Sequence, residues 1–149
     1  MRKTICLMSL LGITFLPSCS SGEEDITKSP FSFREPLTAW GAGSSEVQEY
    51  MDGYRQVSGS AYSMTFEGKD SETAYLYAFS SPGSDLCYAV VSFDLTLRET
   101  LLSWLRDNYS LTGSAAGNHV FTDAGHTTVI TMTSDGEVYL TYRSQAATQ

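Results

Sequence analysis

The sequence predicts an α+β domain in which an antiparallel sheet of about six strands carries two helices on one face. Hydrophobic residues change from helical spacing to strand-like alternation twice along the chain, so two αβββ units follow one another. Short turn-rich gaps separate the strands of each unit, as in antiparallel hairpins. Residues 36–143 are enough for one hydrophobic core but not for two, which predicts a single domain over that range.

The first helix is predicted where apolar side chains recur at the spacing of one helix face. These positions are Val47, Tyr50, Met51 and Tyr54. Ser45 with Gln48 has the pattern of a capping box at the start of this helix. Just before it lies Trp40, which we expect to anchor the helix to the sheet because an aromatic ring buries much area in a small domain.

Three strands are predicted to follow, at residues 61–67, 73–80 and 86–94. Turn residues fill both gaps between them, at residues 68–71 and 81–84. Residues 86–93 are apolar on both faces, unlike the two preceding runs, which alternate. We therefore expect residues 86–93 to form a central strand of the sheet.

The second unit repeats this order. Thr96 with Glu99 has the pattern of another capping box, and the helix that follows carries an apolar stripe. The stripe consists of Leu97, Leu101, Trp104 and Leu105. Three further strands are predicted around residues 119–121, 127–133 and 137–142, with a hairpin turn at residues 134–136. Residues 144–149 are predicted to be a disordered tail.

Residues 1–18 have the three parts of a secretion signal: a basic start, an apolar stretch over residues 5–16, and Ser18 before Cys19. The apolar stretch is shorter than the roughly 18 residues that span a bilayer, so no transmembrane helix is predicted. The run Leu16-Pro17-Ser18-Cys19 resembles the lipobox of bacterial lipoproteins, which implies that Cys19 carries lipid such as palmitate and anchors the protein to a membrane. The alternative is ordinary secretion, with Cys19 a free thiol.

A small polar spacer and three acidic residues follow Cys19, at residues 20–25. This run resembles the acidic export tag of surface lipoproteins of Bacteroidetes, which implies an outer-membrane protein at the cell surface. The alternative is a solvated acidic tether, with the domain at the periplasmic face. Residues 19–35 lack apolar periodicity, so we expect them to form a flexible acidic tether.

The charge of the mature chain excludes one class of partner. Once residues 1–18 are removed, seven of the nine basic side chains remain against all 17 acidic ones, which gives a formal charge of −10. The basic residues are scattered, whereas nucleic acid is bound by clustered Lys and Arg, so no nucleic-acid partner is predicted. Cys87 is then the only cysteine besides Cys19. Its apolar neighbours predict a small buried core residue and not a nucleophile.

The stretch at residues 36–51 contains a Trp-Gly-x-x-Ser run that leads into a Val and a Met at helical spacing. It resembles small Bacteroidetes cell-envelope lipoproteins of unassigned function. Together with the αβββ order, it is distantly similar to the β-lactamase-inhibitor-like fold, which also holds the small lipoprotein of the outer-membrane barrel-assembly machinery. The resemblance implies a protein-binding envelope lipoprotein that is not an enzyme, and it transfers no binding residues to this chain.

Candidate catalytic and metal-binding groups are few. His119, Asp123 and His126 are the only cluster with metal-ligand chemistry, and no further ligand joins them by spacing. The glycines at residues 41 and 43 lack the third glycine and the lysine of a phosphate-binding loop. No serine lies in a Gly-x-Ser-x-Gly elbow. We therefore predict no catalytic residue, no metal and no cofactor.

Aromatic residues suggest two functions. The nine Tyr, seven Phe and two Trp are more rings than so small a domain buries completely. If the helices covered the face of the sheet that carries Leu76, Tyr75 and Tyr77 would form an exposed stripe that Tyr62 could extend. Tyr75 and Tyr77 point to the same side of their strand as Phe79, however, which favours the core for both of them. We predict a domain that binds another envelope protein. The alternative is a surface lipoprotein that binds a glycan or another small ligand.

Overall fold

The computed structural model describes residues 33–148 apart from residue 71, and Arg34–Gln149 form one compact unit. The leader, Cys19 and the acidic run at residues 23–25 lie outside the described residues. Two boundaries differ from our expectation. Residues 34 and 35 belong to the folded unit and not to a tether. A 3₁₀ helix, η3 (Gln145–Thr148), is found where we expected a disordered tail.

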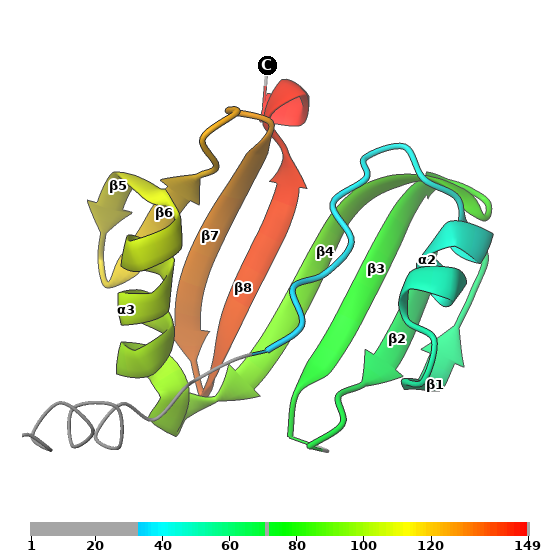
Figure 1. Ribbon diagram of the computed structural model, residues 1–149, viewed down its shortest axis with the longest axis horizontal. Coiled ribbons are helices and arrows are strands. Elements are labelled where there is room, and N and C mark those ends of the chain that lie inside the picture. Colours follow the sequence, from blue (N-terminus) through cyan, green and yellow to red (C-terminus); the bar gives the residue numbers. More distant parts are fainter. Residues whose placement is uncertain (1–32, 71, 149) are drawn as a thin grey trace, which may run out of the picture. The chain divides into compact units, whose positions relative to one another are not determined.

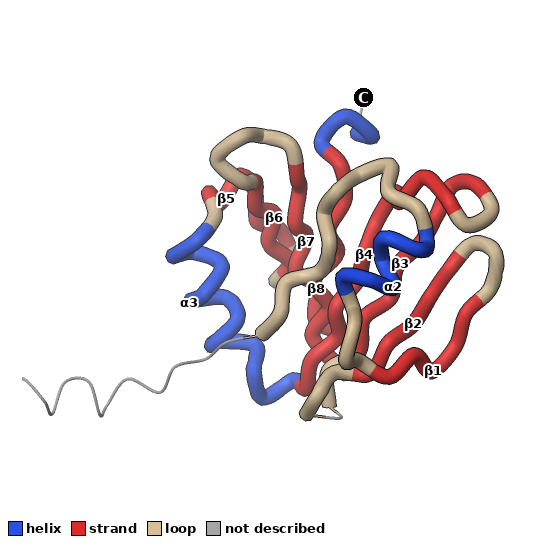
Figure 2. Tube along the Cα trace, turned by 45° about the vertical axis from the view of Figure 1, so that its right-hand side comes forward, coloured by secondary structure: helices blue, strands red, loops and turns tan. Residues whose placement is uncertain are grey.

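The predicted α+β class is confirmed. Helices α2 (Ser44–Tyr50) and α3 (Arg98–Asn108) lie on the same face of an antiparallel sheet (Figure 1), and the segment at residues 34–43 runs between them (Figure 2). A short 3₁₀ helix, η2 (Leu95–Leu97), leads directly into α3. The strands are β1 (Arg55–Gly59), β2 (Ser63–Glu67), β3 (Ala74–Ser81), β4 (Ser84–Asp94), β5 (Ser110–Ala115), β6 (Asn118–Thr122), β7 (Thr128–Asp135) and β8 (Glu137–Ser144).

The sheet has eight strands, so our expectation of six was wrong. The two strands that we missed, β1 and β5, are the two edges of the sheet. Every residue of β1 is exposed, as are all but one in β5. An edge strand that buries neither face shows no alternation of apolar and polar side chains, so periodicity cannot reveal it. Each repeated unit is therefore αββββ and not αβββ.

The strand order is β1-β2-β3-β4-β8-β7-β6-β5, and every neighbouring pair is antiparallel. The two units therefore lie side by side in one sheet and meet where β4 pairs with β8, as Figure 1 shows. The expectation that residues 86–93 form a central strand is confirmed, because they lie in β4.

The two edge hairpins have the same register. Arg55 pairs with Glu67 in β1–β2, and Ser110 pairs with Thr122 in β5–β6. The two residues of the second pair therefore lie 55 positions after those of the first. Each hairpin then has a register shift after its second residue pair. A β-bulge at this position twists an edge strand and makes it a poor template for another chain.

The strand registers nearer the centre of the sheet show that the two αββββ units are related by an approximate two-fold axis. The β2–β3 and β6–β7 ladders keep the same correspondence, and the β3–β4 and β7–β8 ladders make Val90 the equivalent of Thr141. Val90 also pairs directly with Thr141 across the β4–β8 junction. The axis therefore passes through this pair, and the sequence-based prediction of an internal duplication has a structural counterpart.

The hydrophobic core lies between the sheet and the two helices. Tyr75 and Tyr77 are 2% and 0% exposed, so their assignment to the core is confirmed, whereas Tyr62 is 55% exposed. The helices contribute Val47, Met51, Leu101, Leu102 and Leu105. The buried sheet positions on this face include Met64, Phe66, Tyr75, Tyr77, Ala89, Val91, Phe93, Phe121, Ile130, Met132, Val138, Leu140 and Tyr142.

Neither predicted capping box forms. Helix α2 begins after Gly43, whose backbone N–H donates to Glu46 Oε2 at 2.9 Å. The Asp94 carboxylate caps η2 by accepting a hydrogen bond from the Thr96 N–H at 2.9 Å, and α3 begins only at Arg98. Several neighbouring polar residues can serve as caps, and the end of the preceding strand or loop decides which one does.

Candidate functional site on the open face of the sheet

The face of the sheet opposite α2 and α3 is covered by no described helix, and we call it the open face. Its central row crosses six strands through consecutive cross-strand pairs. All members of the row are uncharged and only partly exposed. They are Thr65, Leu76, Val90, Thr141, Thr131 and Val120.

The two ends of the open face differ in charge. At one end, Glu137 pairs with both Asp94 and Asp135, and all three side chains are exposed. The charge of Glu137 also raises the pKa of the neighbouring Tyr139 hydroxyl. At the other end, Arg143 is exposed and has no hydrogen bond or ion pair with any described residue. The open face therefore has an uncharged centre, an acidic end, the Arg55–Glu67 ion pair at its β1–β2 edge and the cation of Arg143 at the end opposite the acids.

Two hollows lie on the open face. A shallow one of about 160 Å³ lies near its centre, between Leu76, Val90 and Tyr139. A larger one of about 520 Å³ lies at the corner where β6, β7 and β8 meet the loop before β7, and we call it the corner hollow. The corner hollow is lined by Thr112, Val120, Thr122, His126, Val129, Arg143 and Gln145.

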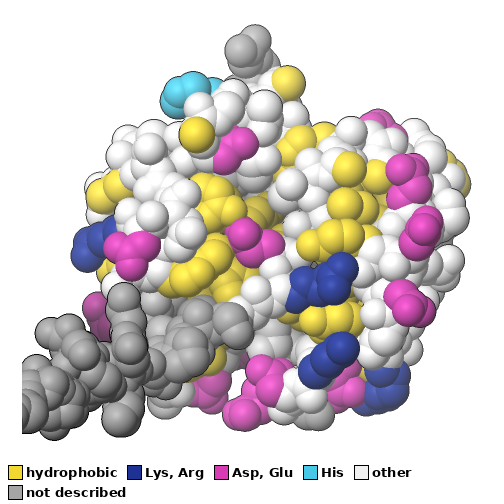
Figure 3. Space-filling view, viewed as in Figure 1, with side chains coloured by type: hydrophobic (Ala, Val, Ile, Leu, Met, Phe, Trp, Pro, Cys, Tyr) yellow, Lys and Arg dark blue, Asp and Glu magenta, His cyan; other side chains and the backbone are white. Residues whose placement is uncertain are grey.

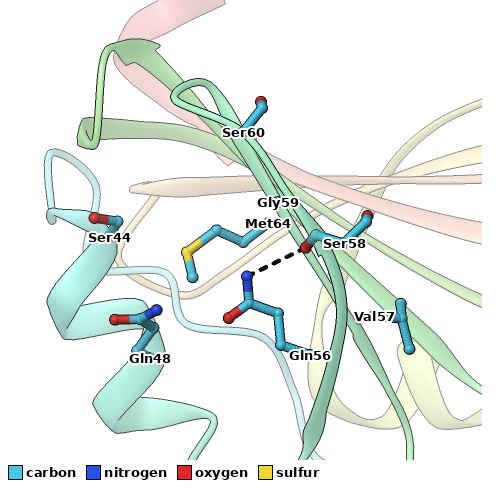
Figure 4. Close-up of a pocket in the computed structure, with 8 residues that line it drawn as sticks. All are labelled: Ser44, Gln48, Gln56, Val57, Ser58, Gly59, Ser60 and Met64. Atoms are coloured by element: carbon cyan, nitrogen blue, oxygen red, sulfur yellow. Dashed lines mark hydrogen bonds between the residues drawn. The ribbon is translucent and has the colours of Figure 1, made fainter.

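A third hollow, of about 570 Å³, lies beside the edge strand β1 on the helix side (Figure 4). Gln48 of α2 and Gln56 of β1 both point into it, and Met64 of β2 lies behind them. The Gln56 side chain donates to the carbonyl of Ser58 at 3.3 Å. All the lining side chains are uncharged, and nothing in their arrangement selects one kind of ligand.

On the helix side, tyrosine hydroxyls hold the backbone of residues 34–37. Tyr75 donates to the carbonyl oxygen of residue 34 and Tyr50 to that of residue 35, both at 2.8 Å. The N–H of residue 37 donates to the Tyr77 hydroxyl at 3.1 Å. Burial raises the pKa of both Tyr75 and Tyr77, so these hydroxyls stay protonated and available as donors.

The Glu35 side chain extends this cluster to two tyrosines of the second αββββ unit. Its Oε2 accepts hydrogen bonds from the hydroxyls of Tyr109 and, at 3.4 Å, Tyr142. Burial raises the pKa of both tyrosines, and Glu35 raises it further. Trp40 Nε1 donates to Thr128 Oγ1 at 3.2 Å, so this ring ties the segment before α2 to β7 of the second αββββ unit. Because groups of the chain itself already occupy these hydrogen bonds, the cluster holds residues 34–37 in place and is not a binding site.

The rest of the helix-side surface is mixed. Figure 3 shows exposed hydrophobic side chains on this side, interrupted by both acidic and basic ones. The exposed edge residues Val57 and Leu111 lie in β1 and β5, at opposite ends of the sheet. The open face, with its ordered charge arrangement, is therefore the stronger candidate for a binding surface.

The structure does not bring the candidate metal ligands His119, Asp123 and His126 together to hold a metal. His119 is buried on the core face, 3.1 Å from the Ser114 hydroxyl. The Asp123 carboxylate accepts a hydrogen bond from the N–H of Thr127 at 2.7 Å within its own loop. His126 is exposed and lies at the corner hollow. Within the described part of the chain, no group of three or more His, Cys, Asp or Glu side chains is arranged to hold a metal ion.

Cys87 is partly exposed, so our expectation of a buried core residue was wrong. It lies where the β3–β4 register shifts, and its Sγ donates to the carbonyl of Ala78 at 3.3 Å. The apolar run around it is half-exposed because the second face of β4 is the open face. Both helices were predicted to lie on one face, but the apolar run gave no sign that its other side is left half-exposed.

Comparisons of the chain with protein-family models, with curated proteins and with solved structures found no match. Among the described residues, no helix is both long and apolar enough to cross a membrane.

Proposed function

We propose that this chain is a non-catalytic lipoprotein that is anchored in the outer membrane through Cys19, is exposed at the cell surface and binds another envelope protein through its open face. The observation that carries the proposal is the uncharged, half-exposed row at the centre of that face. Protein interfaces combine such uncharged centres with a polar rim. The lipobox at Cys19 and the acidic run after it support the membrane address.

The open face also indicates the chemistry of the partner. Its centre is uncharged, and three carboxylates lie at one end. A matching partner has an uncharged contact surface with Lys or Arg along one margin. The bulges in β1 and β5 make strand addition at either edge unfavourable, which favours docking on the face.

A photo-crosslinking residue at Val90 or Thr141 of the lipidated chain in cells tests the docking surface. We expect both positions to give the same discrete crosslinked species, because they are paired at the centre of the open face. Leu95 is a matched control, since it is exposed and lies off this face. Equal yields at Leu95, or a product that contains only two copies of this chain, would contradict the proposal.

Charge reversal sharpens the same experiment. The double substitution Asp94→Lys with Glu137→Lys is expected to reduce the crosslink at Val90, because it opposes a basic margin on the partner. Glu49→Lys with Asp52→Lys reverses two exposed acids, on α2 and just after it, by the same total charge and is expected to leave the yield unchanged. An undiminished crosslink in the double variant would exclude a charge-complementary partner.

The membrane anchor is tested separately. Cys19→Ala removes the acylated sulfur and is expected to leave an uncleaved, non-acylated precursor. Metabolic labelling with palmitate and fractionation of cells measure this. A processed variant that stays in the outer membrane without lipid would exclude the lipoprotein assignment. Protease shaving of intact cells then tests surface exposure.

The second candidate function, binding of a glycan or small ligand, has lost part of its basis, because Tyr75 and Tyr77 lie in the core. Another observation supports it. Tyr88 is 39% exposed and pairs with Arg143 on the open face, next to the corner hollow. Saturable retention on an immobilised acidic polysaccharide, lost in Tyr88→Ala, tests this candidate.

A further inference from the structure

The corner hollow is built from three adjacent strands. Thr122 of β6 pairs with Val129 of β7, which pairs with Arg143 of β8, so the three side chains lie in one row of the open face. His126, from the loop before β7, and Gln145, at the start of η3, line the same hollow. The volume of about 520 Å³ lies within the usual range for small-molecule sites.

Two buried polar atoms of this hollow lack partners among the residues that the structure describes. Thr122 Oγ1 and Gln145 Oε1 have no hydrogen-bond partner among the described residues, and the Thr122 residue is only 7% exposed. Buried polar atoms without partners are rare in folded proteins, because each one costs free energy. Arg143 lies beside them with no described partner of its own. Two acceptor oxygens and one guanidinium without described partners therefore lie together at the corner hollow.

We propose that the corner hollow binds a small sugar acid, with the ligand carboxylate on Arg143 and its hydroxyls on Thr122 and Gln145. A guanidinium recognises a carboxylate through two parallel hydrogen bonds. Val129 forms an apolar floor for the C–H groups of a sugar ring, and the exposed ring of Tyr88 next to Arg143 is suited to stacking on it.

The charges around the hollow favour a single negative charge. Arg143 is the only permanent cation among the described residues that line the hollow, and the chain carries a net charge of −8, so a phosphate dianion would lack enough compensation. Asp123 lies in the same loop as His126, but its carboxylate already accepts three hydrogen bonds from Thr127 and Thr128. It is therefore held within its own loop and not offered to a ligand or a metal.

Titration calorimetry of the full-length chain in detergent with sodium glucuronate tests this site. We expect saturable binding that is about tenfold or more weaker in Arg143→Gln, because one charge-assisted contact is removed. Arg106→Gln is the matched control, since Arg106 is exposed on α3, and it should bind like the unchanged chain. Absence of glucuronate binding, or equal affinity in Arg143→Gln, would overturn the proposal.

Two further ligands and one further variant make the test specific. Glucose lacks the carboxylate and propionate lacks the ring, so both are expected to bind about tenfold or more weakly than glucuronate. Equal affinity for either one would refute a sugar acid as the ligand. Thr122→Val is expected to weaken glucuronate binding without lowering the melting temperature, because it removes an unpartnered hydroxyl. Weakened binding together with a lower melting temperature would indicate a structural role instead.

This inference goes beyond the proposed docking function and can fail independently of it. Crosslinking at Val90 reports on the partner surface and needs no ligand in the corner hollow. Glucuronate binding by the purified chain needs no partner. Loss of calorimetric binding with intact crosslinking would remove only the sugar-acid site.

Discussion

The two αββββ units share strand registers but differ in the side chains that fill them. Tyr75 and Tyr77 of the first unit occupy the positions of Ile130 and Met132 in the second. At another core position of the second unit lies His119, the equivalent of Met64. The same positions are thus buried in both units, but the side chains that occupy them differ in size and polarity. The comparison teaches that this fold depends on which positions are buried more than on which side chains bury them.

The helices of the two αββββ units also differ in length, and residues 34–43 cover the part of the sheet that the shorter helix leaves open. Helix α2 has 7 residues and α3 has 11, so the first unit has less helix with which to cover its half of the sheet. The tyrosines that replace aliphatic residues in this unit use their hydroxyls to hold residues 34–37 against the core. The aromatic chemistry of the first unit therefore compensates for its shorter helix.

The largest expected effect tests whether the two units share one core. Phe66 and Phe121 occupy equivalent positions and are 3% and 0% exposed. Phe66→Ala and Phe121→Ala are each expected to lower the free energy of unfolding by about 3–5 kcal/mol, through lost burial and a cavity. Because one continuous sheet joins the units, urea unfolding of either variant should remain a single transition.

Leu111→Ala is the control, since Leu111 pairs with Phe121 but is 47% exposed. We expect a change within about 0.5 kcal/mol. Two separate transitions in one of the phenylalanine variants would show that the units unfold independently, against the shared core.

A smaller effect tests the tie between residues 34–37 and the second unit. Glu35→Ala leaves the hydroxyls of Tyr109 and the buried Tyr142 without their carboxylate acceptor. We expect a loss of about 1–3 kcal/mol in the free energy of unfolding, measured by urea titration. Glu35→Gln keeps an acceptor oxygen and should lose less.

A double-mutant cycle separates this tie from general packing. In the Glu35→Ala background, Tyr142→Phe is expected to cause little further loss, because its hydroxyl has already lost its partner. Glu49→Ala, at an exposed acid on α2, provides the baseline. If Glu35→Ala lowers stability no more than Glu49→Ala, the side chain does not hold the segment.

The smallest expected effect compares two loops that both units contain. The Asp70 carboxylate accepts hydrogen bonds from the N–H and hydroxyl of Thr73 before β3, and Asp123 accepts from Thr127 and Thr128 before β7. Asp70→Ala and Asp123→Ala are each expected to cost about 0.5–1 kcal/mol, a reduced value because both carboxylates are largely in solvent.

The same pair of variants predicts a pH dependence. Burial raises the pKa of each carboxyl, but the hydrogen bonds outweigh it, so the pKa of both falls below its ordinary value. The stabilisation is therefore complete above the ordinary pKa of about 3.9 and is lost as pH falls through the lowered value. Urea midpoints of unchanged and variant chains should converge in strongly acidic buffer, and a constant difference at all pH values would refute this assignment.

Much of the domain could be predicted from periodicity along the chain. Six strands and both helices were found because each of them buries one side or both, which leaves a repeating pattern of apolar residues. The edge strands β1 and β5 left no such pattern, since they bury almost nothing. The capping residues were wrong because several adjacent polar side chains satisfy the same local rule.

The candidate site was mostly beyond sequence reasoning. In the sequence His126 stands out only beside His119 and Asp123, a set too small for a metal site, and the structure does not bring these three together to hold one. Thr122 and Arg143 belong to strands separated by β7, and no local motif relates them. The one sign of this site in the sequence is Arg143, a basic residue without basic neighbours in an acidic chain.

The sequence by itself determined the α+β class, the order of the predicted elements and the positions that form most of the core, because side-chain periodicity is a local property of a helix or strand. Tertiary structure decided how β4 meets β8, which face stays open and which polar atoms converge at the corner hollow. Those features depend on pairing between residues far apart in the chain, and register across strands is set by contacts that no local pattern encodes.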